Sequence, residues 1–147
     1  MFDSIVVGTD GSETAGEAVR QAISLAQPLG AKLQIVSAYE PVSDTRLRDE
    51  SKQAPSDLQW MVNPREDVEA TLREAADLAA ESGVKTETFA RQGDPADAIL
   101  DVAEENGSDL IVVGNKGMTG AKRFLLGSVP NKVSHHAPCS VLIIRTT

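Results

Sequence analysis

The sequence predicts an α/β fold built on an open parallel sheet with helices on both faces. Short apolar runs rich in β-branched residues recur along the chain, as in strands that are buried on both sides. Segments with helical periodicity separate these runs, and glycines stand where such segments end. Strands that alternate with helices are typical of a parallel sheet, because each crossover lays a helix against it.

The first two predicted strands flank the first helix. Residues 4–9, SIVVGT, form one β-branched run, and residues 31–39, AKLQIVSAY, form the second. Between them, small and aliphatic residues repeat at helical spacing up to a glycine that provides the stop. Two starts of this helix are compatible with the sequence: Ser12 as the N-cap, or Thr14 with Glu17 in a capping box.

The remaining elements continue the alternation of strands and helices. The helix that we predict within residues 93–106 begins with Asp94 as its cap and Pro95 at its first position, where proline is well tolerated. Residues 65–82 also have helical periodicity, and 84–91 form a weaker strand. The last three elements are a strand at 109–114, a short helix at 128–136 and a strand at 139–145.

One segment, residues 41–62, resists assignment. It is longer than the connections that compact domains usually have. Two interpretations stay open, a short helix or a partly mobile connection. The total length suits one domain, and we expect a single domain over residues 1–147.

The composition is acidic. Twenty-two Asp and Glu stand against fourteen Lys and Arg, for a net charge of −8. This charge disfavours broad binding to nucleic acid or to an anionic membrane. No apolar run approaches the roughly 18 residues of a membrane helix, and the N-terminus lacks the basic region of a signal peptide. With a single cysteine, we expect a cytoplasmic protein whose surface is either ordinarily acidic or adapted to salt.

A glycine-rich stretch follows the strand at 109–114. In an open parallel sheet, ligands bind beyond the carboxyl ends of the strands, where the strand order reverses. The strands at 4–9 and 109–114 are the natural central pair, so the loops after them converge on one crevice. The glycines of the stretch are Gly114, Gly117, Gly120 and Gly127, and Ser128 follows the last of them.

These glycines predict a phosphate site. Glycine lets a backbone N–H approach an anion with no Cβ in the way. Gly127 and Ser128 stand at the start of a predicted helix, where unpaired N–H groups and the helix dipole attract phosphate. The alternative is that the glycines merely make tight turns. The sequence has neither a Walker loop nor a G-x-G-x-x-G motif after the first strand.

The spacing G-x2-G-x9-G-S resembles the ATP-binding signature of the universal stress protein family. The resemblance covers nearly the whole chain, through IVVGTDGSETAGEAV, GDPADAI, DLIVVGNKG and LLGSVPNKVSHHAPCSVLIIR. It implies a Rossmann-like fold of the adenine nucleotide alpha hydrolase-like type. In that fold five parallel strands lie in the order 3-2-1-4-5.

The resemblance also implies a ligand and a site. The ligand would be ATP or another adenine nucleotide, with Mg2+ carried by its phosphates. Gly8, Thr9 and Asp10 would border the base and ribose, and Ala38 would stand at the adenine slot. Asp10 has two open roles, helping to position Mg2+ or capping the first helix turn. The residues expected around ribose and phosphates are Val113, Gly114, Asn115, Lys116, Gly117, Met118, Thr119 and Gly120, and those at the phosphate tail are Gly127, Ser128 and Val129.

Three functions are compatible with such a site. The first is a nucleotide-dependent regulatory or stress-response module. The second is an enzyme, a slow ATPase or a nucleotide-dependent transferase on a related fold. We assign no catalytic residues, because the sequence offers no Walker lysine and no obvious set of acids for a metal. The third is a structural dimer module with a vestigial pocket, which the intact glycine signature disfavours.

The last strand predicts a homodimer. In the implied order it lies at a sheet edge, and residues 139–145, CSVLIIR, are strongly apolar. A long apolar edge invites pairing with another chain, and family members that resemble this chain often dimerise this way. The competing interpretation is that the acidic surface keeps the molecule monomeric and the preceding helix covers the edge.

Overall fold

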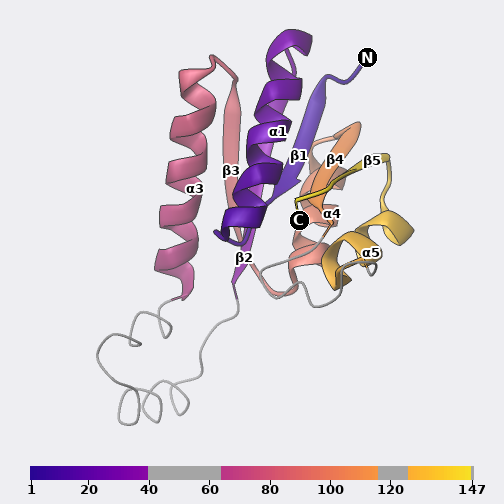
Figure 1. Cartoon of the computed structure of the whole chain (residues 1–147). Helices are drawn as coiled ribbons and strands as arrows, with labels where there is room; N and C mark the ends of the chain where they lie inside the picture. Colours follow the sequence, from indigo (N-terminus) through magenta and orange to yellow (C-terminus); the bar gives the residue numbers. More distant parts are fainter. Residues whose placement is uncertain (40–63, 116–125, 147) are drawn as a thin grey trace.

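The computed structural model describes residues 1–39, 64–115 and 126–146. Within these ranges, five parallel strands form one sheet in the order β3-β2-β1-β4-β5, which confirms the predicted order (Figure 1). The unassigned connection 41–62 lies outside the described residues. The strands are β1 (Ser4–Gly8), β2 (Lys32–Tyr39), β3 (Thr86–Gln92), β4 (Leu110–Gly114) and β5 (Ser140–Ile144), and the helices are α1 (Glu13–Leu29), α3 (Pro64–Glu81), α4 (Pro95–Glu105) and α5 (Ser128–His136).

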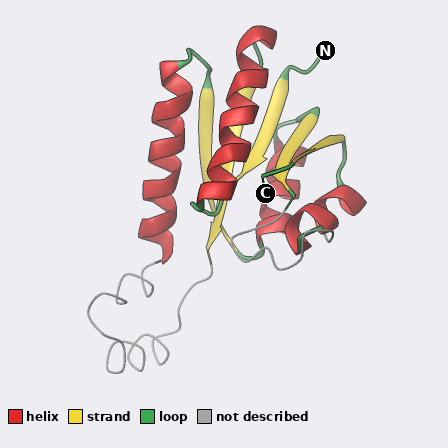
Figure 2. Ribbon diagram, in the orientation of Figure 1, coloured by secondary structure: helices red, strands yellow, loops and turns green. Residues whose placement is uncertain are grey.

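The sheet lies between two helical layers (Figure 2). Helices α1 and α3 cover one face, and α4 and α5 cover the other. Successive residues of a strand point to opposite faces, so Ile5 and Val7 pack under α1 while Val6 packs under α4. All three are fully buried. This double burial explains why the central strands are continuous apolar runs.

Ser12, and not Thr14, is the N-cap of α1. The Ser12 hydroxyl accepts a hydrogen bond from the N–H of Ala15 at 3.1 Å, and the Asp10 carboxylate accepts one from the N–H of Ser12 at 2.9 Å. The predicted capping box is wrong, because the Glu17 carboxylate instead accepts hydrogen bonds from side chains one turn further along the helix. Asp10 therefore shapes the turn before the helix, and Ser12 caps it.

Helix α4 begins as the sequence predicts. The Asp94 carboxylate accepts a hydrogen bond from the N–H of Asp97 at 3.0 Å, and Pro95 occupies the first helical turn. From α5, the Lys132 ammonium lies 3.3 Å from Asp94 and 2.9 Å from Asp97. The Asp97 N–H above all, and Lys132 next, hold the pKa of Asp94 below its usual value, against the opposing effect of burial. These contacts join the beginning of α4 to the middle of α5.

Asp94→Ala is expected to lower the free energy of unfolding by about 1 kcal/mol at neutral pH, because the cap is lost. The pKa of Asp94 is lowered in the folded state. The stabilisation that the Asp94 carboxylate gives the fold is therefore present above its unfolded-state pKa and is lost as the pH falls through its folded-state pKa. Urea unfolding at neutral and acidic pH should show that the difference in the free energy of unfolding between variant and parent becomes smaller in acid. Asp94→Asn keeps a cap acceptor and serves as the control, and a gap independent of pH would contradict the prediction.

Among the residues that the structure describes, no helix is both long enough and apolar enough to cross a membrane.

Candidate nucleotide-binding site

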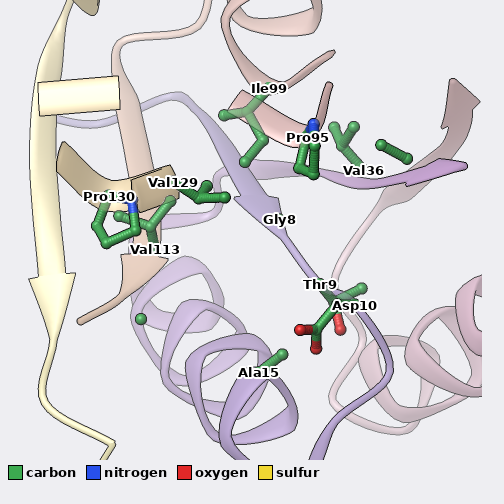
Figure 3. A pocket seen from close by; sticks show the side chains of 12 residues that line it. Gly8, Thr9, Asp10, Ala15, Val36, Pro95, Ile99, Val113, Val129 and Pro130 are labelled. Atoms are coloured by element: carbon green, nitrogen blue, oxygen red, sulfur yellow. The ribbon is translucent and has the colours of Figure 1, made fainter. Parts of the chain in front are cut away.

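An open pocket lies at the carboxyl ends of β1, β2 and β4 (Figure 3). Its volume is about 120 Å³. The pocket sits between β1 and the beginnings of α4 and α5, at the point where the chain order in the sheet reverses. Its lining residues are Gly8, Thr9, Asp10, Ala15, Val36, Ala38, Pro95, Ile99, Val113, Gly114, Val129 and Pro130.

Two apolar walls face each other across the pocket. Pro95 and Ile99 of α4 lie with Val36 on one side (Figure 3). Val113 of β4 lies with Val129 and Pro130 of α5 on the other. Such walls suit a flat, largely apolar ring, because ligand sites are mostly apolar with a few placed polar groups. The polar side chains among the lining residues, Thr9 and Asp10, stand at the end of β1.

Gly8 lets α4 approach the sheet closely. A Cβ built on this residue would lie 2.4 Å from Cδ1 of Ile99 and 3.0 Å from Cγ1. Only a residue without a side chain fits there while Ile99 keeps its place. The next residue, Thr9, donates its N–H to the carbonyl of Val36 at 2.9 Å and so extends the β1–β2 pairing to the pocket.

The N-terminus of α5 lies beside the pocket. Gly127 precedes the helix with extended backbone, φ −63° and ψ 164°, and no described side chain caps the helix there. The N–H groups of a first helical turn have no partner within the helix, and they attract anions together with the helix dipole. Since Val129 and Pro130 line the pocket, a ligand there could place a phosphate at this end.

The structure places seven of the fifteen predicted residues at the pocket. Those that line the pocket are Gly8, Thr9, Asp10, Ala38, Val113, Gly114 and Val129. Three more predicted residues are close to lining residues in the sequence: Asn115 follows Gly114, Ser128 precedes Val129, and Gly127 precedes Ser128. Lys116, Gly117, Met118, Thr119 and Gly120 lie outside the described residues.

Sequence reasoning missed five lining residues: Ala15, Val36, Pro95, Ile99 and Pro130. Val36 could have been found, because it shares a strand face with Ala38 by the two-residue period. In the sequence, Pro95 and Ile99 indicated only structural roles. Pro95 is a proline in a first helical turn, and Ile99 belongs to the apolar stripe of the same helix. Their position at the pocket depends on where α4 begins relative to the sheet.

Asp10 is exposed, and its carboxylate is used by the N–H of Ser12. Across the described ranges, no group of three or more His, Cys, Asp or Glu gathers in a way that could hold a metal ion.

Comparison with known proteins assigns the family. The model of the universal stress protein family matches residues 1–145. The chain is 37% identical over 150 residues to the universal stress protein YxiE of Bacillus subtilis, covering 99% of this chain and 100% of that protein. It is 39% identical over 148 residues to Rv1636 of Mycobacterium tuberculosis, covering 99% and 98%. A solved universal stress protein in complex with cAMP matches with a TM-score of 0.73 and 35% identity, covering 99% of this chain and 98% of that one. The chain belongs to the universal stress protein family.

Proposed function

We propose that this protein binds ATP in the pocket between α4 and α5 and acts in the cytoplasm as a nucleotide-dependent regulatory module of a stress response. One observation carries the proposal: the N-terminus of α5, which no described side chain caps, lies beside a pocket that has two apolar walls. The cAMP bound to a similar family member supports an adenine nucleotide as the ligand. The glycine spacing at 114, 117 and 127 favours a ligand with a phosphate tail.

The proposed binding mode follows from the chemistry of the walls. The base would lie between Ile99 and Val129, where apolar contact removes both ring faces from water. The phosphates would reach the first turn of α5 at Ser128. Mg2+ would travel with the phosphates, with Asp10 at the open side of the pocket.

Calorimetric titration tests this proposal. MgATP should bind more tightly than AMP or cAMP, because only ATP extends a triphosphate to α5. Absence of binding by all three nucleotides would reject the site, and tighter binding of cAMP or AMP would reject the preference for ATP. Phosphate release should stay near one equivalent per site, whereas turnover of about 1 s⁻¹ or more, within the common enzyme range, would favour an ATPase.

We further propose a homodimer formed through β5. The strand lies at the sheet edge, beside β4, and Leu142 and Ile143 are 39% and 38% exposed. Apolar side chains and backbone groups at an open edge favour pairing with another chain. A two-fold axis beside the strand would pair β5 with its own copy in antiparallel fashion and close the assembly.

Ile143→Pro is expected to abolish this dimer. In a parallel pair, alternate residues direct both backbone groups to the neighbouring strand. The Ile144 carbonyl accepts from Asn115, so Ile144 faces β4 and the N–H of Ile143 faces the open edge. Proline at 143 therefore removes an outward donor and leaves the β4 ladder in place.

Sedimentation at micromolar concentration should show a dimer for the parent and for the packing control Ile143→Ala. The proline variant should sediment as a monomer with an unchanged circular dichroism spectrum. A monomeric parent would reject the dimer without affecting the nucleotide site.

A further inference from the structure

Asn115 joins three segments of the chain at the end of β4. Its backbone N–H donates to the carbonyl of Ile144 at 2.8 Å, and its backbone carbonyl accepts from the N–H of Gly127 at 2.9 Å. Its side-chain Oδ1 accepts from the N–H of Thr146 at 2.8 Å and from the Thr146 hydroxyl at 3.0 Å. One residue thus holds the end of β5 and the residue that precedes α5.

The hydrogen bond from Thr146 departs from the regular pattern of a parallel ladder. Successive bonds in such a ladder alternate between donation to one strand and donation from it. After the bond from Asn115 N–H to Ile144, the next regular bond would run from Thr146 N–H to the backbone carbonyl of Asn115. Here it runs to Oδ1, so the side-chain amide replaces the backbone carbonyl as the last acceptor in the described part of the β4–β5 ladder.

The Asn115 carbonyl, which a regular ladder would direct toward Thr146, accepts from the N–H of Gly127 instead. We propose that Asn115 is a positioning residue: its Oδ1 completes the β4–β5 ladder, and its carbonyl thereby seats Gly127 and the N-terminus of α5 beside the pocket. The consequence for ligand affinity rests on the nucleotide-binding function proposed above. The effect on Gly127 is a property of the ligand-free protein and stands apart from it.

The chemistry of asparagine suits this position. Alanine offers no acceptor for Thr146, so the carbonyl of residue 115 would turn toward the Thr146 N–H, as in a regular ladder, and the bond that it accepts from Gly127 would weaken. Aspartate offers the acceptor but adds a negative charge beside a helix end that is expected to receive phosphate. Asparagine supplies the acceptor without the charge.

Asn115→Ala provides the first test. Amide hydrogen exchange, followed by NMR on the ligand-free protein, should show the Gly127 amide exchanging roughly five-fold faster, as expected for a lost hydrogen bond of ordinary net strength. MgATP affinity should fall roughly five-fold for the same reason. Parental exchange at Gly127 in a folded Asn115→Ala variant would overturn the proposal.

A second substitution tests the competition itself. Thr146→Pro removes the competing N–H, so the double variant Asn115→Ala/Thr146→Pro should regain slow exchange at Gly127. A double variant that exchanges as fast as Asn115→Ala would overturn the proposal. If Asn115→Ala does not fold, Asn115→Asp decides instead. This variant keeps the acceptor for Thr146 and should show parental exchange at Gly127. Faster exchange at Gly127 would count against Asn115 as the positioning residue.

The two proposals can fail separately. If Gly127 exchange responds as expected and the parent binds no adenine nucleotide, Asn115 positions α5 and the nucleotide function is rejected. If the parent binds MgATP and Gly127 exchange ignores Asn115, the nucleotide function stands and the positioning role is rejected.

Discussion

Gly8→Ala is expected to reduce ATP affinity at least about tenfold, equivalent to about 1.4 kcal/mol. The added Cβ would lie 2.4 Å from Cδ1 of Ile99, so the isoleucine has to move. Both residues line the pocket, and the displaced side chain would change its shape. Overpacking of this kind should also lower the free energy of unfolding by about 1–3 kcal/mol.

Calorimetry and urea unfolding measure the two effects of Gly8→Ala. The double variant Gly8→Ala/Ile99→Ala removes the clashing atoms and should bind ATP more tightly than Gly8→Ala alone. Gly16→Ala is the matched control, because its Cβ would meet only Arg20 Nη1 at 3.5 Å, an ordinary contact. Alanine within a helix should stabilise the control by about 0.5–1 kcal/mol. Parental ATP affinity in a folded Gly8→Ala protein would contradict the site.

Ile35→Ala is expected to have the largest effect on stability, a loss of about 2–5 kcal/mol. Ile35 is fully buried, and it lies on β2 between β1 and β3. Its side chain packs in the cluster under α1 and α3, on the face away from α4. A cavity there cannot close easily, because strands hold the residue from both sides.

Urea unfolding at neutral pH measures this loss, with Ile35→Val as a control that should cost about 0.5–1.5 kcal/mol. The folded fraction of Ile35→Ala should keep parental ATP affinity, since Ile35 does not line the pocket, whereas its neighbour Val36 does. Equal losses for the alanine and valine variants would show that this part of the core is not closely packed. Ile35→Ala should thus lower stability alone, whereas Gly8→Ala should lower both stability and ATP affinity.

The order of the elements could be predicted because its signals are local. Buried runs such as residues 4–9 are continuous and apolar since both faces are covered. Gly30 ends α1 with φ +64°, a conformation that glycine adopts freely. The start of α4 is marked within one turn of sequence, because Asp94 caps the helix and Pro95 suits its first turn. The strand order came from the resemblance to a family, and the structure confirms it.

The start of α1 shows where local signals compete. Both Ser12 and Thr14 are good caps, and the sequence offers no means of choosing. The choice falls on Ser12 because Asp10 accepts its N–H and holds the turn. Glu17, the partner that Thr14 would need, is engaged by Arg20 and Gln21.

The sequence by itself determined the alternation of strands and helices, the placing of Gly8 and Gly114 at the carboxyl ends of β1 and β4, and the family. Only the tertiary structure decided which core residues also form the pocket wall, as Ile99 shows, since this depends on how α4 sits against Gly8. It also decided the role of Asn115, whose side chain takes over a backbone bond from Thr146. Both outcomes depend on contacts between segments far apart in the chain, and no local pattern records the distance or the register at which such segments meet.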